Sequence, residues 1–112
     1  MNCLIVDDEP IAIDVIKAHL EKISYVNMVL KTTSAFEGIE IINTKSIDVV
    51  LLDIQMPELS GIELLNSLKY QPLIIFTTAY PDYAIKSYDF DAIDYLMKPI
   101  AFDKFLKALN KA

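Results

Sequence analysis

Short apolar runs alternate along this chain with segments in which apolar residues recur every three or four positions. The runs "CLIV", "VVLL" and "LIIF", at residues 3–6, 49–52 and 73–76, are rich in β-branched side chains. Such runs are typical of parallel strands that are covered on both faces. We therefore predict three central strands there. Two strands nearer an edge are predicted at 26–31 and 92–97, where polar residues interrupt the apolar pattern.

Helical spacing fills the intervals between these strands. The residues with this spacing are Ile13, Ile16, Leu20 and Ile23, and then Phe102, Phe105, Leu106 and Leu109. Ser60 and Glu63 form an S-x-x-E capping box, which predicts that a helix begins there. Weaker helical patterns cover residues 35–44 and 82–89. Five repeats of strand then helix predict an α/β fold, a doubly wound parallel sheet with helices on both faces.

Composition narrows the class of protein. A chain of 112 residues is predicted to form one domain, residues 1–112. Ten lysines, no arginine and a net charge of -6 argue against direct binding to nucleic acid. No apolar run approaches the roughly 20 residues that cross a membrane, so we expect a soluble cytoplasmic domain. Cys3 is predicted to be a core residue, and the lone His19 to lie on the surface.

The polar residues whose side chains could bind an ion or react all directly follow strands. Asp7 and Asp8 follow the first strand, Asp53 the third, Thr77 and Thr78 the fourth, and Lys98 the fifth. In an open doubly wound sheet, the carboxyl ends of the strands form the edge at which ligands bind. These positions therefore predict one site at that edge.

The charges at this edge predict the kind of ligand. If the first and third strands are neighbours, Asp7, Asp8 and Asp53 meet in one crevice. Two unit charges about 4 Å apart repel by about 4 kcal/mol at an effective dielectric constant near 20. A hard cation such as Mg²⁺ relieves this repulsion and favours phosphate oxygens as further ligands. Lys98 and a threonine hydroxyl would complete a site shaped for phosphate.

The stretches "VDDE", "LLDIQMPELSG", "FTTAY" and "DYLMKPI" resemble the receiver domain of two-component response regulators, over essentially the whole chain. The resemblance implies a flavodoxin-like five-stranded sheet with strand order 2-1-3-4-5 and five helices. It also implies a signalling function, in which a sensor histidine kinase donates a phosphoryl group to the domain. The domain would then catalyse only its own phosphorylation and dephosphorylation, and would not be an enzyme that turns over a substrate.

The resemblance assigns the site residues by motif position. Asp53 is the implied phosphoacceptor, and it also binds Mg²⁺. Asp8 is a direct Mg²⁺ ligand, Asp7 holds the metal through water, and the main-chain carbonyl of Gln55 is the remaining protein ligand.

Four further positions follow from the same motifs. Thr78 is the implied hydroxyl that contacts the phosphoryl group, and Tyr95 is the implied switch aromatic. Lys98 is the cation that pairs with the phosphate, and Pro99 after it is expected in a cis peptide.

The stretch "YAIKSYDFDAIDYLMKPI" further resembles receivers whose output is a LytTR-type DNA-binding domain. We therefore expect this chain to be the N-terminal part of a longer transcription regulator. A homodimer that forms on phosphorylation is also expected, because a basic stripe on the last helix could face acidic residues of a second copy. The stripe consists of Lys104, Lys107 and Lys111, and the acids are Asp89, Asp91 and Asp94.

Three other functions fit parts of this pattern. A phosphatase of the haloacid dehalogenase type also uses a strand-end aspartate, but it needs a second aspartate where Gln55 stands. A flavin carrier needs a hydroxyl- and glycine-rich loop where this chain has "DDEP". A degenerate receiver that acts only as a binding module would lack part of the acidic set.

Purely structural roles are also open for the single residues. Asp7 and Asp8 could hold a turn or cap a helix, and Thr78 could start one. Lys98 could be a solvated loop charge, and Tyr95 could simply pack.

Overall fold

The computed structural model describes residues 1–57, 59–79 and 92–112. In these ranges, the strands and helices follow one another in the predicted order. The elements are β1 (Asn2–Val6), α1 (Pro10–Glu21), β2 (Met28–Thr32), α2 (Ala35–Thr44), β3 (Val49–Asp53), α3 (Gly61–Asn66), β4 (Leu73–Thr78), β5 (Asp94–Met97) and α5 (Phe102–Asn110). The helix predicted at 82–89 lies outside the described residues, which contain four of the five expected helices.

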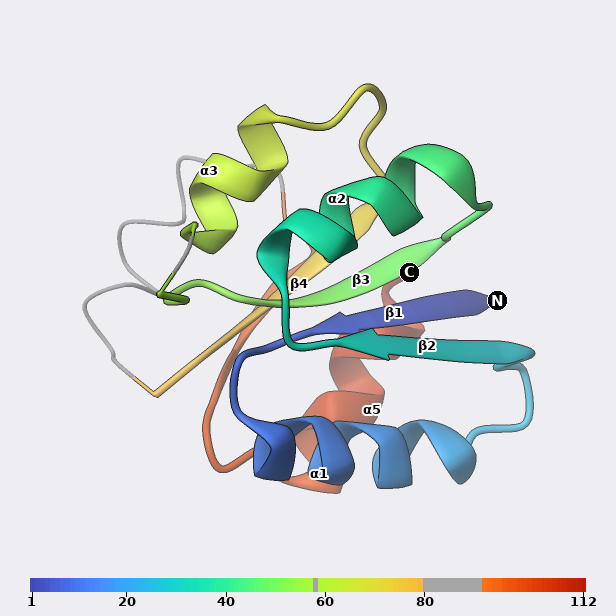
Figure 1. Ribbon diagram of the computed structural model, residues 1–112. Helices are drawn as coiled ribbons and strands as arrows, with labels where there is room; N and C mark the ends of the chain where they lie inside the picture. The colour runs from blue at the N-terminus through green and yellow to red at the C-terminus, as the bar shows by residue number, and fades with distance from the viewer. Residues whose placement is uncertain (58, 80–91) are drawn as a thin grey trace.

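The five strands form one parallel sheet in the order β2-β1-β3-β4-β5. This order confirms the expected α/β topology. Helices α1 and α5 cover one face of the sheet, and α2 and α3 cover the other (Figure 1). Because β1 and β3 are neighbours, their carboxyl ends open at the same edge, where the chain order reverses.

Burial separates the central strands from the edge strands, as the apolar pattern predicts. Every residue of β3 is buried, whereas β2 and β5 each bury only one. The two edge strands begin two residues later than expected, at Met28 and Asp94. The sheet sets these boundaries, because Met28 pairs with Asn2 and Asp94 pairs with Ile75.

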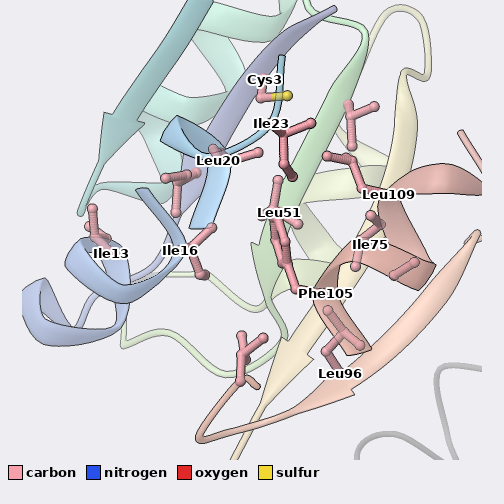
Figure 2. Packing of buried hydrophobic residues seen from close by; sticks show 14 residues of the cluster. Cys3, Ile13, Ile16, Leu20, Ile23, Leu51, Ile75, Leu96, Phe105 and Leu109 are labelled. Carbon is pink, nitrogen blue, oxygen red and sulfur yellow. The ribbon is translucent and has the colours of Figure 1, made fainter. Parts of the chain in front are cut away.

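Strand alternation divides the hydrophobic core into two layers. Cys3, Leu51 and Ile75 point to one face, where they pack with Leu20 of α1 and Phe105 of α5 (Figure 2). The residues between them along each strand pack against α2 and α3 on the other face. The predicted core position of Cys3 is confirmed. Burial is the main cause that raises the pKa of its thiol to about 11, so the reactive thiolate is disfavoured.

The prediction of a surface position for His19 is only partly correct, because the residue is half-buried. Its ring lies between α1 and α5, with ring centroids 5.3 Å from Phe102 and 5.5 Å from Phe105. Its Nε2 lies 2.8 Å from the main-chain oxygen of Ile100, and an N–H there would donate to that carbonyl. Ile16 lies one turn before His19 along α1, so His19 borders the apolar face of the helix, and the packing of α5 covers its ring there. No helix in the described part of the chain is long and apolar enough to span a membrane.

Candidate functional site

Asp53 is the last residue of β3, and its side chain is buried. The chain turns back directly after it, because the amide of Gly61 donates to the carbonyl of Ile54 at 2.7 Å. A Cβ atom on Gly61 would lie 2.6 Å from the carbonyl oxygen of Asp53, so this close approach requires glycine. The predicted capping box of Ser60 and Glu63 is confirmed and begins α3 at this point. The local sequence thus fixes the course of the loop that follows Asp53.

Asp7 and Asp8 follow β1, and the structure brings both to the same edge as Asp53. Each of these carboxylates offers an oxygen, and Glu9 offers another, with the oxygens all within 4.8 Å of one another. Sequence reasoning did not assign a role to Glu9. The available signal was its place as a third successive acid, directly before Pro10 at the start of α1.

The structural roles proposed for the first two acids are partly correct. Oδ1 of Asp7 accepts a hydrogen bond from the amide of Glu9 at 2.9 Å, so Asp7 does hold a turn. The N-cap of α1, however, is Glu9, and its side chain makes no capping hydrogen bond. Oδ2 of Asp7 accepts from an ammonium group that lies 2.8 Å away within the site.

That ammonium group belongs to Lys98, which lies between three carboxylates. Its Nζ is 2.8 Å from Oδ2 of Asp7, 2.8 Å from Oε1 of Glu9 and 3.3 Å from Oδ2 of Asp53. The side chain is only 12% exposed. Its backbone amide donates to the main-chain carbonyl of Thr78, and this hydrogen bond ties the loop to β4. Lys98 is therefore not a solvated loop charge. The expected cis peptide between Lys98 and Pro99 is confirmed.

Burial and neighbouring charges shift the pKa values of Asp53 and Lys98. Burial, followed by the charge of Asp7, raises the pKa of Asp53 to about 7, although Lys98 and the amide of Gln55 oppose this shift. Burial lowers the pKa of Lys98, but its bonds to Asp7 and Glu9 and the charge of Asp53 outweigh that effect. The pKa of Lys98 is therefore raised, and the lysine stays a cation.

A cavity of about 380 Å³ opens in front of Asp53. Its lining residues are Asp8, Glu9, Asp53, Gln55, Met56, Pro57, Ala79 and Lys98. The space suits a group of phosphate size together with water. Oxygen ligands from carboxylates are those that hard divalent cations prefer, so the residues present fit such an ion.

Two further predicted residues lie on β4 and β5, next along the chain or in the sheet to residues of the site. Thr78 is buried at the end of β4, one residue beyond Thr77, which pairs with Asp53 in the sheet. Tyr95 stacks on Phe76 with ring centroids 5.7 Å apart, and Phe76 lies two residues before Thr78. Alternation along β4 therefore places Thr78 on the same face of the sheet as Tyr95.

The response regulator receiver domain family matches residues 3–110 of this chain. The chain belongs to that family. One related receiver is part of the transcriptional regulatory protein BtsR of Escherichia coli strain K12. It is 42% identical over 113 residues, which cover 99% of this chain and 47% of that protein. An uncharacterized response regulatory protein of Vibrio cholerae is 36% identical over 99% of this chain and 48% of its own length.

Solved receiver structures share the fold. The response regulatory domain of protein mrkE from Klebsiella pneumoniae superposes with a TM-score of 0.87 at 25% identity, covering 99% of this chain and 93% of that one. A receiver domain protein from Clostridium thermocellum gives a TM-score of 0.82 at 34% identity, covering 97% and 90%. The receiver chain spans about half the length of the curated relatives it matches.

Proposed function

We propose that this receiver takes a phosphoryl group from a phosphohistidine of a sensor histidine kinase onto Asp53. An oxygen of the ionised carboxylate attacks phosphorus, the bond from phosphorus to the imidazole nitrogen breaks, and an aspartyl phosphate forms. One observation carries the proposal: the buried carboxylate of Asp53 faces a cavity together with a largely buried lysine and three further acids. Phosphoryl transfer depends on such positioning and charge stabilisation.

The residues around Asp53 take the roles that the motifs imply. Asp8, Asp53 and the carbonyl of Gln55 would hold Mg²⁺, and Asp7 would help to hold it through water. When bound, Mg²⁺ neutralises charge that builds up on the phosphoryl oxygens.

The side of the site near β4 and β5 binds the phosphoryl group and responds to it. Lys98 pairs with a phosphoryl oxygen, and Thr78 donates its hydroxyl to another. A shift of Thr78 towards the phosphoryl group leaves room into which Tyr95 turns. This movement changes the populations of two states of the output face, because the phosphate binds one state more tightly.

The output of the switch is a DNA-binding domain outside this chain, of the LytTR type. Two facts support a regulator of transcription: the name of the related BtsR protein, and the roughly half of its length that this chain leaves unmatched. We place the whole protein in the cytoplasm, where a kinase and DNA are both accessible. Phosphorylation also favours a homodimer through the face of β5, α5 and the predicted fourth helix, which lies outside the described residues.

A mass measurement tests the proposal against the alternatives. The domain is incubated with Mg²⁺ and a small acyl phosphate, and intact mass is followed over time. A receiver gains one phosphate that is stable in acid and labile in base. Continuous release of inorganic phosphate would instead indicate a phosphatase. The exposed Gln55 stands where such an enzyme needs an acid. An unchanged mass would indicate a binding module.

Asp53→Asn identifies the acceptor. The amide is nearly isosteric with the carboxylate but is not a competent nucleophile, so the variant should fold and gain no phosphate. Asp14→Asn makes the same change on the exposed surface of α1 and should be phosphorylated like the wild type. A full phosphate adduct on the Asp53 variant would contradict the assignment.

A further inference from the structure

The ammonium group of Lys98 has as many acidic neighbours as it has N–H donors. An ammonium carries three donors, and the neighbours are Asp7, Glu9 and Asp53 at 2.8, 2.8 and 3.3 Å. A phosphoryl group that reaches Asp53 needs a donor from the same lysine. Lys98 must therefore release one of its partners when the phosphoryl group arrives.

The three partners differ in how easily they can be released. Asp7 is 1% exposed, and its other oxygen accepts from the amide of Glu9. Its carboxylate therefore cannot move away from Lys98 into water. Asp53 is the acceptor itself. Glu9 is 61% exposed, lies at the mouth of the cavity, and makes no capping hydrogen bond with its side chain. When the ion pair with Lys98 breaks, water can solvate the Glu9 carboxylate.

We infer that Glu9 is a positioning residue that holds Lys98 in the resting domain and releases it to the incoming phosphoryl group. The inference rests on the proposed function and deepens it. The contact stabilises the resting arrangement of Lys98. The free energy needed to break it adds to the activation free energy of phosphorylation, so the reaction is slower. An ion pair whose carboxylate is open to water, as Glu9 is here, is weak, which makes it suitable for release within the reaction.

Two substitutions of Glu9 separate this role from a simple effect of charge. Glu9→Ala removes both the contact and the charge. Glu9→Asp keeps the charge but shortens the side chain by one carbon–carbon bond, about 1.5 Å, so the carboxylate falls short of Lys98. The matched control is Glu21→Ala, which removes an exposed carboxylate at the far end of α1.

The rate of phosphorylation by a small acyl phosphate is measured by intact mass at saturating Mg²⁺. Both Glu9 variants should react about two- to fivefold faster than the wild type, the range that an exposed ion pair spans. The Glu21 variant should react at the wild-type rate. The Mg²⁺ concentration that gives half the maximal rate is measured for every variant.

Other results would overturn the inference. If only Glu9→Ala is faster, Glu9 acts by repelling the anionic donor. If the Glu9 variants are slower and need more Mg²⁺, Glu9 binds the metal. Equal rates in all variants would mean that the contact has no effect on the reaction. A wild-type domain that takes up no phosphate would overturn the proposed function, and the inference with it, so the two failures are distinguishable.

A second measurement does not depend on phosphorylation. Unfolding by urea in the presence of EDTA is compared for Glu9→Ala, Lys98→Met and the double variant. If Glu9 contacts Lys98 in solution, the changes in the free energy of unfolding of the two single variants should not sum to the change of the double variant. Additive changes would show that the two side chains do not interact in solution, and would overturn the inference.

Discussion

Asp53 and Lys98 show how a single residue acquires its chemistry from its surroundings. The carboxylate of Asp53 is buried beside the carboxylate of Asp7, and both effects favour its protonated form. The nucleophile, however, is the ionised form. A cation that enters the acidic cluster counters both effects, which gives a physical reason for a metal requirement.

The raised pKa of Asp53 predicts how the stability of the metal-free domain depends on pH. The folded state binds a proton on Asp53 up to about pH 7, whereas the unfolded chain releases it near its ordinary value of 3.8. The folded state therefore binds more protons in this window, and the free energy of unfolding falls as the pH rises from about 4 to 7. The total loss is on the order of a few kcal/mol.

Asp53→Asn isolates this contribution, because other carboxylates also titrate. Urea unfolding is measured in EDTA at several pH values for the wild type and the variant. The variant should gain stability relative to the wild type as the pH rises through 5 and 6. If the difference in the free energy of unfolding between the two proteins did not change with pH, Asp53 would have the same pKa in the folded and unfolded states.

At the scale of elements, α1 has two functions along its length. Its N-cap, Glu9, contacts Lys98, and its last turn brings His19 to the carbonyl of Ile100. Lys98 and Ile100 belong to the same short loop between β5 and α5. Helix α1 therefore contacts that loop from both of its ends, and these contacts keep Lys98 at the edge of the sheet.

The hydrogen bond of His19 predicts a loss of stability when its donor is removed. His19→Phe keeps a ring against Phe102 and Phe105 but leaves the carbonyl of Ile100 without this donor. Such a loss costs about 1–3 kcal/mol in the free energy of unfolding. His19→Gln supplies a side-chain N–H again and should recover part of it. Equal stability of the phenylalanine variant and the wild type would argue against the hydrogen bond.

For the whole molecule, the sheet topology decides which charges meet. Three strands deliver Asp7, Asp53 and Thr77 to one edge, and the loop after the fifth strand adds Lys98. The whole domain thus gains or loses stability according to what binds at this edge.

Mg²⁺ is predicted to stabilise the domain by relieving repulsion among the carboxylates. At a Mg²⁺ concentration about 100 times its Kd, the gain is about 2.7 kcal/mol. Asp8→Ala should raise the melting temperature in EDTA and abolish the response to Mg²⁺, while Asp14→Ala should keep the wild-type response. Thermal unfolding with and without Mg²⁺ measures both effects, and an unchanged response in the Asp8 variant would refute its role as a ligand.

The predicted dimer is tested by sedimentation of the domain with and without beryllofluoride, at low and high salt. The structure modifies the expected charge pairing, because Lys111 already forms an ion pair of 2.7 Å with Asp94 in its own chain. Pairing between protomers then depends on the exposed Lys104 and Lys107. The other two acids, Asp89 and Asp91, lie outside the described residues.

We expect the mass to rise on activation, and salt to weaken the dimer. An unchanged mass would refute the dimer, and a dimer insensitive to salt would assign it to apolar contacts.

The sequence by itself determined features that depend on neighbouring residues. Apolar runs are short-range patterns, so they located the central strands, and Ser60 with Glu63 located the start of α3. The alternation of elements then implied a parallel sheet, which puts the ends of all its strands at one edge. Asp7, Asp8, Asp53 and Lys98 could therefore be named as a group before their distances were known.

Only the tertiary structure decided the contacts between residues far apart in the chain. His19 and Ile100 are 81 positions apart, and Glu9 and Lys98 are 89 apart. Local periodicity describes which side of a helix is apolar, but not which element packs against each turn of it. His19 borders the apolar face of α1 beside Ile16, which does not say what covers it, and Glu9 looks like one more acid before a helix. Their roles come from the packing of α1 beside α5 and its preceding loop, because that packing alone brings these distant residues into contact.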